Sequence, residues 1–282
     1  LLTHFKCVTY VCDKRFLLLL LFLDYAVEPF YYERGLDFYQ DGQNYSLASL
    51  LYAAGPTLLG KEPFDRLLGS FQVAMKEKTE DALDDLVQAA RDTRWQELPE
   101  ALGPLAKFAA PECLQAIATP GVSTDAAFVV LQSLVSRMEM LADGPYRVEH
   151  DQSKNLLTYH DLLERYIDHN EVITFRQSEI ARISFPLRLK SVTQVDSKSS
   201  HAVQLADVMI GAAIEAANTL TGHRAGSLNA REVIALYEDH ELIHMLPSID
   251  FAEQRRFRRG TRAAELIDYF TAHFGDAANV RA

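Results

Sequence analysis

The hydrophobic residues of this chain change their spacing several times, and the order of those changes limits the fold. Residues 4–12 alternate between two largely apolar faces, which is typical of a central strand. Residues 16–27 are apolar on nearly every side of a helix that ends before Pro29. From Leu47 to Met140 the spacing is helical without a strand pattern, and strands then return. This order predicts an α/β layer interrupted by a helical insertion.

The second half of the chain alternates strands with helices. Strand spacing covers 145–150 and 187–195, and helical spacing covers 153–169 and 200–220. A further helix is expected over 229–246, ended by Pro247. We therefore expect three parts, which are a core of residues 1–43 and 144–222, a helical insertion over about 44–143 and a helical extension over 223–282.

The composition of the 282 residues is that of a soluble globular protein. Apolar residues make up 48% of the chain, and the longest apolar run, Phe16–Leu23, is too short to span a bilayer. A net charge of −11 disfavours a long basic cradle for duplex DNA. The three cysteines form no C-x-x-C pair, which favours a reducing, cytoplasmic compartment. Because Leu1 already begins strand-like sequence, we expect that further residues precede it in the natural protein.

Three acidic residues occupy positions that suit a metal site. Asp151 and Asp196 each follow a strand, where α/β proteins bind their ligands. Asp207 falls within the apolar stripe of the last core helix, which is expected to pack on the sheet. Acids in this arrangement match the oxygen ligands that two Mg²⁺ or Mn²⁺ ions need for phosphodiester hydrolysis. Asp196 and Asp207 can share one site only if the intervening turn folds back and the helix begins near Ser200.

Each of these acids also has a purely structural explanation. An Asp before a helix is the usual N-cap, which suits Asp196, and an Asp within a polar turn suits Asp151. Asp207 would then be a buried carboxylate that pairs with a lysine or with backbone amides. The spacing alone leaves both explanations open.

The run from Asp196 to Asp207 has the pattern D-S-K-x-S-x-x-x-Q-L-A-D. Through this run the chain resembles the domain-of-unknown-function 3800 family, over roughly residues 3–220. The resemblance extends to three further stretches, which are Asp13-Lys14, residues 39–44 and residues 150–153. Members of that family are bacterial and phage-associated proteins of the RNase H-like superfamily. The first strand of the family ends in an Asp-Glu-Ser motif that has no counterpart in this chain.

The resemblance implies an RNase H-like mixed sheet in which residues 4–12, 145–150 and 187–195 take part. It also implies a metal-dependent nuclease, possessing a role in phage defence or in a mobile element. The implied site residues are Asp151, Asp196 and Asp207 as ligands of Mg²⁺ or Mn²⁺, Gln204 to orient a ligand or the scissile phosphate, and Lys14 to neutralise developing charge. The rival is an inactive RNase H-like binding or assembly module, which would have a protein partner or form a homo-oligomer.

Residues 240–244 have the H-E-x-x-H spacing of a zinc protease. On a helix both imidazoles would share one face, and Glu265 would supply a third ligand. Against this function, Glu238 and Asp239 place charges before the first histidine, and Pro247 breaks the helix. The competing interpretation is a helix with two half-buried histidines.

Two other charged features each have two explanations. Asp24, the only charge within the helix at 16–27, is either a paired core acid or a fourth acid of the metal site. A run of arginines near the C-terminus would suit phosphate contacts, or it forms a solvated helix end. These are Arg255, Arg256, Arg258, Arg259 and Arg262.

Overall fold

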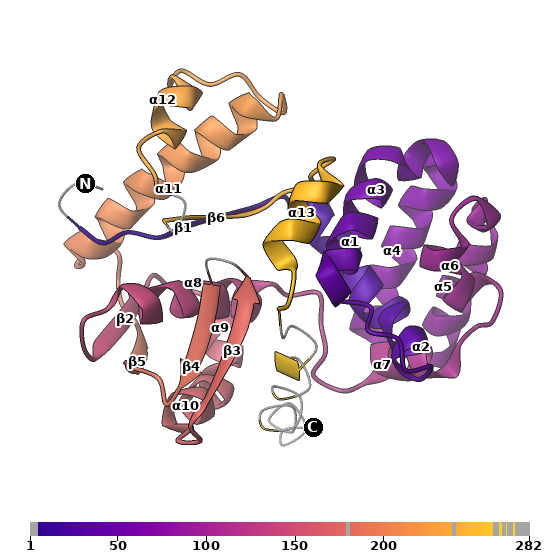
Figure 1. The fold of residues 1–282 in the computed structure, drawn as a ribbon, viewed down its shortest axis with the longest axis horizontal. Coiled ribbons are helices and arrows are strands. Elements are labelled where there is room, and N and C mark those ends of the chain that lie inside the picture. Colours follow the sequence, from indigo (N-terminus) through magenta and orange to yellow (C-terminus); the bar gives the residue numbers. More distant parts are fainter. Residues whose placement is uncertain are drawn as a thin grey trace. The chain divides into compact units, whose positions relative to one another are not determined.

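The computed structural model describes residues 5–178, 181–238 and 241–261, together with residues 265, 266, 269 and 273. The chain divides into two compact units. The first, called the sheet unit, comprises residues 1–11, 125–245 and 269–277. The second, called the helical unit, comprises residues 12–124, 246–268 and 278–282. Helices make up the helical unit in Figure 1, whereas the sheet unit mixes strands with helices.

The helical unit is built from short and medium helices around an aromatic core. Its helices are α1 (Lys14–Ala26), α2 (Glu28–Tyr32), α3 (Gln43–Leu58), α4 (Lys61–Glu77), α5 (Glu80–Arg91), α6 (Pro99–Ala106), α7 (Pro111–Ala118) and α13 (Phe251–Arg258), with short 3-10 turns at Gln40–Gly42 and Trp95–Glu97. Helix α1 begins where Asp13 accepts a hydrogen bond from the amide of Phe16 at 2.9 Å. It packs against α3, α4 and α7, and the buried side chains of this core include Phe16, Phe22, Phe64 and Phe71.

The sheet unit combines paired strands with helices. Its helices are α8 (Ala127–Leu141), α9 (Lys154–Thr158), α10 (His160–Asp168), α11 (His201–Leu220) and α12 (Ala230–Ile234). Its strands are β1 (Thr9–Cys12), β2 (Tyr146–His150), β3 (Ile173–Ser178), β4 (Ala181–Phe185), β5 (Leu189–Gln194) and β6 (Leu242–Met245), where the last residue of β1 already belongs to the helical unit. The described strands pair as β1 with β6, β2 with β5 and β3 with β4. The protein is therefore mixed α/β.

Two of these strand pairs form the framework around the predicted acids. Strands β2 and β5 run parallel, and His150 lies opposite Gln194 at their carboxyl ends. Strands β3 and β4 run antiparallel, with the buried Phe175 opposite the buried Ile183. Helix α8 contacts β4 and helix α10 contacts β5, so each pair has a helical neighbour.

Most predicted elements coincide with observed ones. The strands expected at 145–150 and 187–195 are β2 and β5, and the helix expected at 200–220 is α11. Across the described residues 13–145, helices and turns occur without a strand, as predicted for the insertion. Among the helices that the structure describes, none is both long and apolar enough to cross a membrane.

Two expectations about the strands need correction. The three expected strands do not form one sheet in the described residues, because β1 pairs with β6 and the amide of Thr9 donates to the carbonyl of Glu241 at 2.8 Å. The helix expected over 229–246 is also wrong, since α12 ends at Ile234 and residues 242–245 form β6. Pairing with a strand far away in the sequence outweighs the local helical spacing here.

Candidate functional site

The carboxyl ends of β2 and β5 bring two of the predicted acids to one edge of a parallel strand pair. Asp151 directly follows β2, and Asp196 lies just beyond β5. The amide of Val195 donates to the carbonyl of His150 at 2.9 Å, so the pairing continues up to the first acid. The amide of Ser197 then donates to Asp151 Oδ1 at 3.4 Å, which joins the two strand ends. Both acids are exposed at this edge.

The turn after β5 is folded back by hydrogen bonds among its own residues. Asp196 Oδ1 accepts from the amide of Lys198 at 2.9 Å, and the Asp196 carbonyl accepts from the amide and the hydroxyl of Ser199 at 2.9 and 2.8 Å. Ser200 caps α11 by accepting from the amide of Val203 at 3.4 Å. The N-cap is therefore Ser200 rather than Asp196, and the helix begins where a site shared by Asp196 and α11 requires it.

Gln204 holds this turn against α11. Its side-chain amide nitrogen donates to the carbonyls of Ser197 and Lys198, at 2.9 and 3.3 Å. Both carbonyls belong to the backbone that directly follows Asp196. The geometry thus gives Gln204 a positioning role, and its expected contact with a ligand or a phosphate stays a prediction.

A further acid at this edge, Glu149, was not among the predicted residues. Its carboxylate accepts a hydrogen bond from the Ser200 hydroxyl at 3.3 Å, which ties the start of α11 to β2. The sequence carried a signal for it, because Glu149 and Asp151 are two residues apart and so lie on the same side of an extended chain.

Hydrogen bonding keeps Asp151 ionised. The backbone amide of Gln152 is the largest cause that holds the pKa of Asp151 below its ordinary value, followed by the hydroxyl and amide of Ser197 and the charge of His150. Slight burial acts in the opposite direction. Over the described ranges, no group of three or more His, Cys, Asp or Glu side chains is arranged to hold a metal ion.

Asp207 is exposed, which corrects the expectation that it lies in a buried stripe. Of that stripe, Val203 and Ala213 are buried, whereas Ile210 and Ile214 are 43% and 48% exposed. The stripe followed from the expectation that α11 packs on the sheet. Among the described elements α11 contacts α12 most, as Figure 1 also shows. Asp207 is therefore solvated, and it needs no buried partner.

Two other predicted residues lie on α1, in the helical unit. Lys14 is the first residue of α1, and it is exposed. Asp24 is half-buried, and the hydroxyl of Tyr39 donates to its Oδ1 at 3.3 Å. Burial raises the pKa of Asp24 to about 7, although hydrogen bonds to Tyr39 and Asn44 act in the opposite direction. These local partners are those expected of a paired core acid.

The H-E-x-x-H run does not have the helix that the zinc-protease alternative requires. His240 lies outside the described residues, and His244 lies on β6. Residues four apart share one face of a helix, but on a strand they are about 13 Å apart. Glu265 is exposed, and nothing in residues 241–245 forms the expected helix.

The C-terminal arginines do not share one environment. Arg258 lies over the ring of Tyr45, with its guanidinium carbon 4.0 Å from the ring centroid. Arg262 lies outside the described residues. The exposed members are Arg255, Arg256 and Arg259. Arg258 therefore anchors α13 to α3, while the three exposed side chains are solvated.

In comparisons with known proteins, no family model, curated protein or solved structure matches this chain.

Proposed function

We propose that this chain is an RNase H-like, metal-dependent nuclease and that Asp151 and Asp196 belong to its active site. The observation that carries the proposal is the parallel pairing of β2 with β5, which sets both acids at the carboxyl ends of neighbouring strands. Ligands of α/β proteins bind at such ends. The resemblance of residues 196–207 to the domain-of-unknown-function 3800 family supports the same activity.

The donor chemistry at this edge suits Mg²⁺ or Mn²⁺. Both ions prefer carboxylate oxygens, and Asp151 and Asp196 are exposed acids that accept hydrogen bonds from the turn between β5 and α11. These two residues would hold the ion, and the proposal extends to Asp207. A bound ion supplies an activated water and stabilises negative charge on the phosphodiester.

The remaining residues of the proposed site act on position and charge. Gln204 fixes the turn backbone that follows Asp196, and the bond from Ser200 to Glu149 holds the start of α11 at β2. Lys14 would neutralise charge that develops on the phosphate. The substrate of the proposed reaction is a nucleic acid.

Cleavage assays on the purified chain test this proposal. Labelled single- and double-stranded DNA and RNA are each incubated with Mn²⁺ or Mg²⁺. Asp151→Asn and Asp196→Asn are expected to lose about 100-fold or more of the activity, because one electrostatic contact at a reacting centre contributes that much. Asp207→Asn is the third variant, and its loss is expected to be similar. The matched control is Asp161→Asn, which removes an exposed acid of α10 and leaves cleavage unchanged.

Two outcomes would refute the nuclease. One is a wild-type chain that cleaves none of the four substrates with either ion. The other is cleavage by Asp151→Asn and Asp196→Asn at the wild-type rate.

A binding or assembly module is the second candidate, because α11 leaves several apolar side chains in solvent. Leu205, Val208 and Ile214 are 41%, 66% and 48% exposed. Single exposed apolar residues are ordinary, but several on one helix are typical of an interaction surface. This candidate predicts a wild-type chain that forms oligomers without cleaving nucleic acid. Light scattering after gel filtration would then show that Val208→Ser lowers the molar mass.

A further inference from the structure

The aromatic ring of Tyr269 is seated on the β3–β4 pair. Its centroid lies 5.0 Å from that of Phe175 on β3 and 6.0 Å from that of Phe185 on β4. Tyr166 of α10 packs edge-on against Phe185, with 5.4 Å between centroids. The ring of His273 stacks on Tyr269 at 4.1 Å. This seat places the hydroxyl of Tyr269 and the imidazole of His273 beside the segment that joins α10 to β3.

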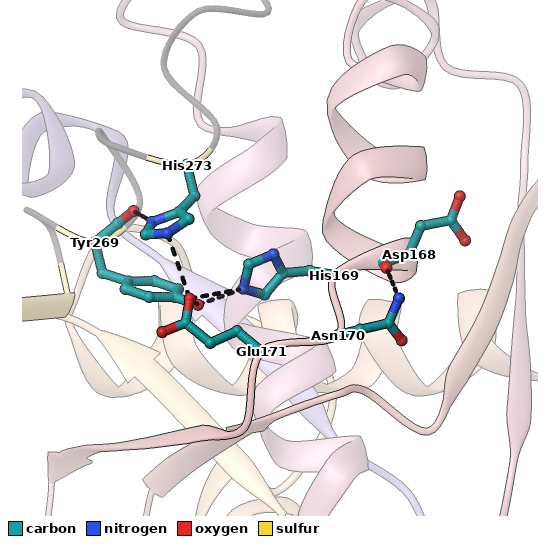
Figure 2. Close-up of polar contacts among 6 residues, drawn as sticks. All are labelled: Asp168, His169, Asn170, Glu171, Tyr269 and His273. Atoms are coloured by element: carbon teal, nitrogen blue, oxygen red, sulfur yellow. Dashed lines mark hydrogen bonds and ion pairs between the residues drawn. The ribbon is translucent and has the colours of Figure 1, made fainter.

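The polar atoms at the seat form one connected group of four side chains (Figure 2). The hydroxyl of Tyr269 donates to Glu171 Oε2 at 2.9 Å, and it also contacts His169 Nε2. His273 Nε2 lies 3.4 Å from Glu171 Oε2, and His273 Nδ1 lies 2.9 Å from the carbonyl of Tyr269. His169 Nε2 is 3.7 Å from Glu171 Oε2. One carboxylate oxygen thus faces a phenol and two imidazoles.

The protons that these contacts need can be counted. The phenol gives its single proton to Glu171, so its oxygen can accept a proton carried by His169 Nε2. A neutral imidazole carries that one proton, so His169 needs no charge. Both ring nitrogens of His273 instead face acceptors, which are the Tyr269 carbonyl and the Glu171 carboxylate. His273 therefore completes the group only as an imidazolium with two protons.

We propose that this group is a proton-dependent clasp, which holds Tyr269 and His273 on the β3–β4 pair at mildly acidic pH and weakens as the pH rises. Loss of a proton from His273 would leave a nitrogen lone pair 3.4 Å from the carboxylate of Glu171. Imidazole side chains change charge between about pH 5 and 8. The closed clasp binds the proton more tightly than the open one, so its stability is present at low pH and is lost toward alkaline pH. The proposal does not depend on the proposed nuclease.

The groups that face His273 allow one positive charge there. Glu171 favours an imidazolium, whereas His169 lies 5.3 Å away, centroid to centroid, and would oppose a second charge. Partial burial is the main cause that lowers the pKa of His169, with a smaller contribution from His273, and Glu171 acts in the opposite direction. Asp168 points away from the group in Figure 2, and its carbonyl accepts from Asn170 at 2.6 Å. One proton, on His273, therefore operates the clasp.

Hydrogen exchange of the full chain at about pH 5.5 and about pH 8 tests the clasp. Protection factors, which correct for faster intrinsic exchange at alkaline pH, are measured for peptides that contain residues 265–273. They are expected to fall on the order of threefold in the wild type, as for loss of a partly exposed ion pair. His273→Gln and Glu171→Gln are expected to show the lower protection at both pH values.

The matched control is His160→Gln. His160 Nε2 lies 3.2 Å from Glu164 Oε1 on α10, and both side chains are exposed, so this change removes a histidine–glutamate pair outside the clasp. The control should keep the pH-dependent fall. Equal protection of the wild type at both pH values, or an unchanged fall in both Gln variants of the clasp, would overturn the proposal. Loss of protection on adding EDTA at about pH 5.5 would also overturn it, since a metal ion rather than a proton would then join the imidazoles to Glu171.

Discussion

Helices α1 and α11 look alike in sequence, because both are long, apolar and poor in charge, yet they are buried to different extents. On α1, Phe16, Leu19 and Phe22 are all 0% exposed. On α11, Val208 and Ile210 are 66% and 43% exposed. Apolar composition therefore sets how much surface a helix is able to bury, and its neighbours decide how much is buried.

The neighbours of the two helices differ in kind. Helix α1 is surrounded by α3, α4 and α7, and Phe22 meets Phe71 of α4 edge-on at 5.4 Å. Helix α11 makes polar contacts near both ends. Gln204 bonds to the turn before it, and Glu215 Oε1 accepts from the amide of Leu228 at 2.8 Å. We infer that apolar packing holds α1 and that polar contacts hold α11.

The largest expected effect is a cavity in the core around α1. Phe22→Ala is expected to lower the free energy of unfolding by about 3–5 kcal/mol, because a fully buried ring leaves a void that its neighbours fill only in part. Val208→Ala on α11 should change it by less than about 0.5 kcal/mol, since the side chain is largely in solvent. Urea denaturation measures both. Equal losses in the two variants would show that α11 is as well packed as α1.

The acids of the two helices should differ in the same way. Asp24 on α1 has a pKa raised to about 7 by burial, so the folded protein binds its proton more tightly than the unfolded chain. This contribution to stability is complete below about pH 4 and is lost as the pH rises to about 7. Asp24→Asn is therefore expected to match the wild type at about pH 4 and to be about 2–4 kcal/mol more stable at about pH 8.

Asp207→Asn on α11 is the matched control for Asp24. The Asp207 side chain is exposed, and its removal should change the stability by less than about 0.5 kcal/mol at either pH. Urea denaturation at the two pH values measures both variants. A wild-type stability that does not fall from about pH 4 to about pH 8 relative to Asp24→Asn would contradict the burial of Asp24.

Local patterns predicted the elements that carry the candidate site. The period-two spacing of residues 187–195 predicted β5, and the Ser-Ser pair after the polar turn predicted where α11 begins. The position of Asp151 and Asp196 after parallel strands then follows from chain order alone. These features depend on residues that are close together in the sequence, which is why the pattern contains them.

Features that depend on distant partners were not predicted. The β3–β4 pair went unassigned, although Ile183, Phe185 and Leu187 alternate as buried residues with exposed neighbours. Residues 242–245 had helical spacing, but β1 offers them a strand partner. The exposure of Asp207 depends on which neighbours α11 finds, and the spacing of its own residues does not contain that information.

The smallest expected effect tests what holds α11. Gln204→Ala removes two hydrogen bonds to the turn carbonyls and should cost about 1 kcal/mol in the free energy of unfolding. Gln88→Ala is the matched control, because Gln88 is an exposed glutamine of α5 whose amide bonds only the nearby Asp92 among its contacts in the structure. Its loss should be within about 0.5 kcal/mol. If polar contacts hold α11, Gln204→Ala costs more than Val208→Ala. The reverse order would mean that the apolar side chains of α11 carry its stability even where they meet solvent, and the contrast with α1 would then be one of degree.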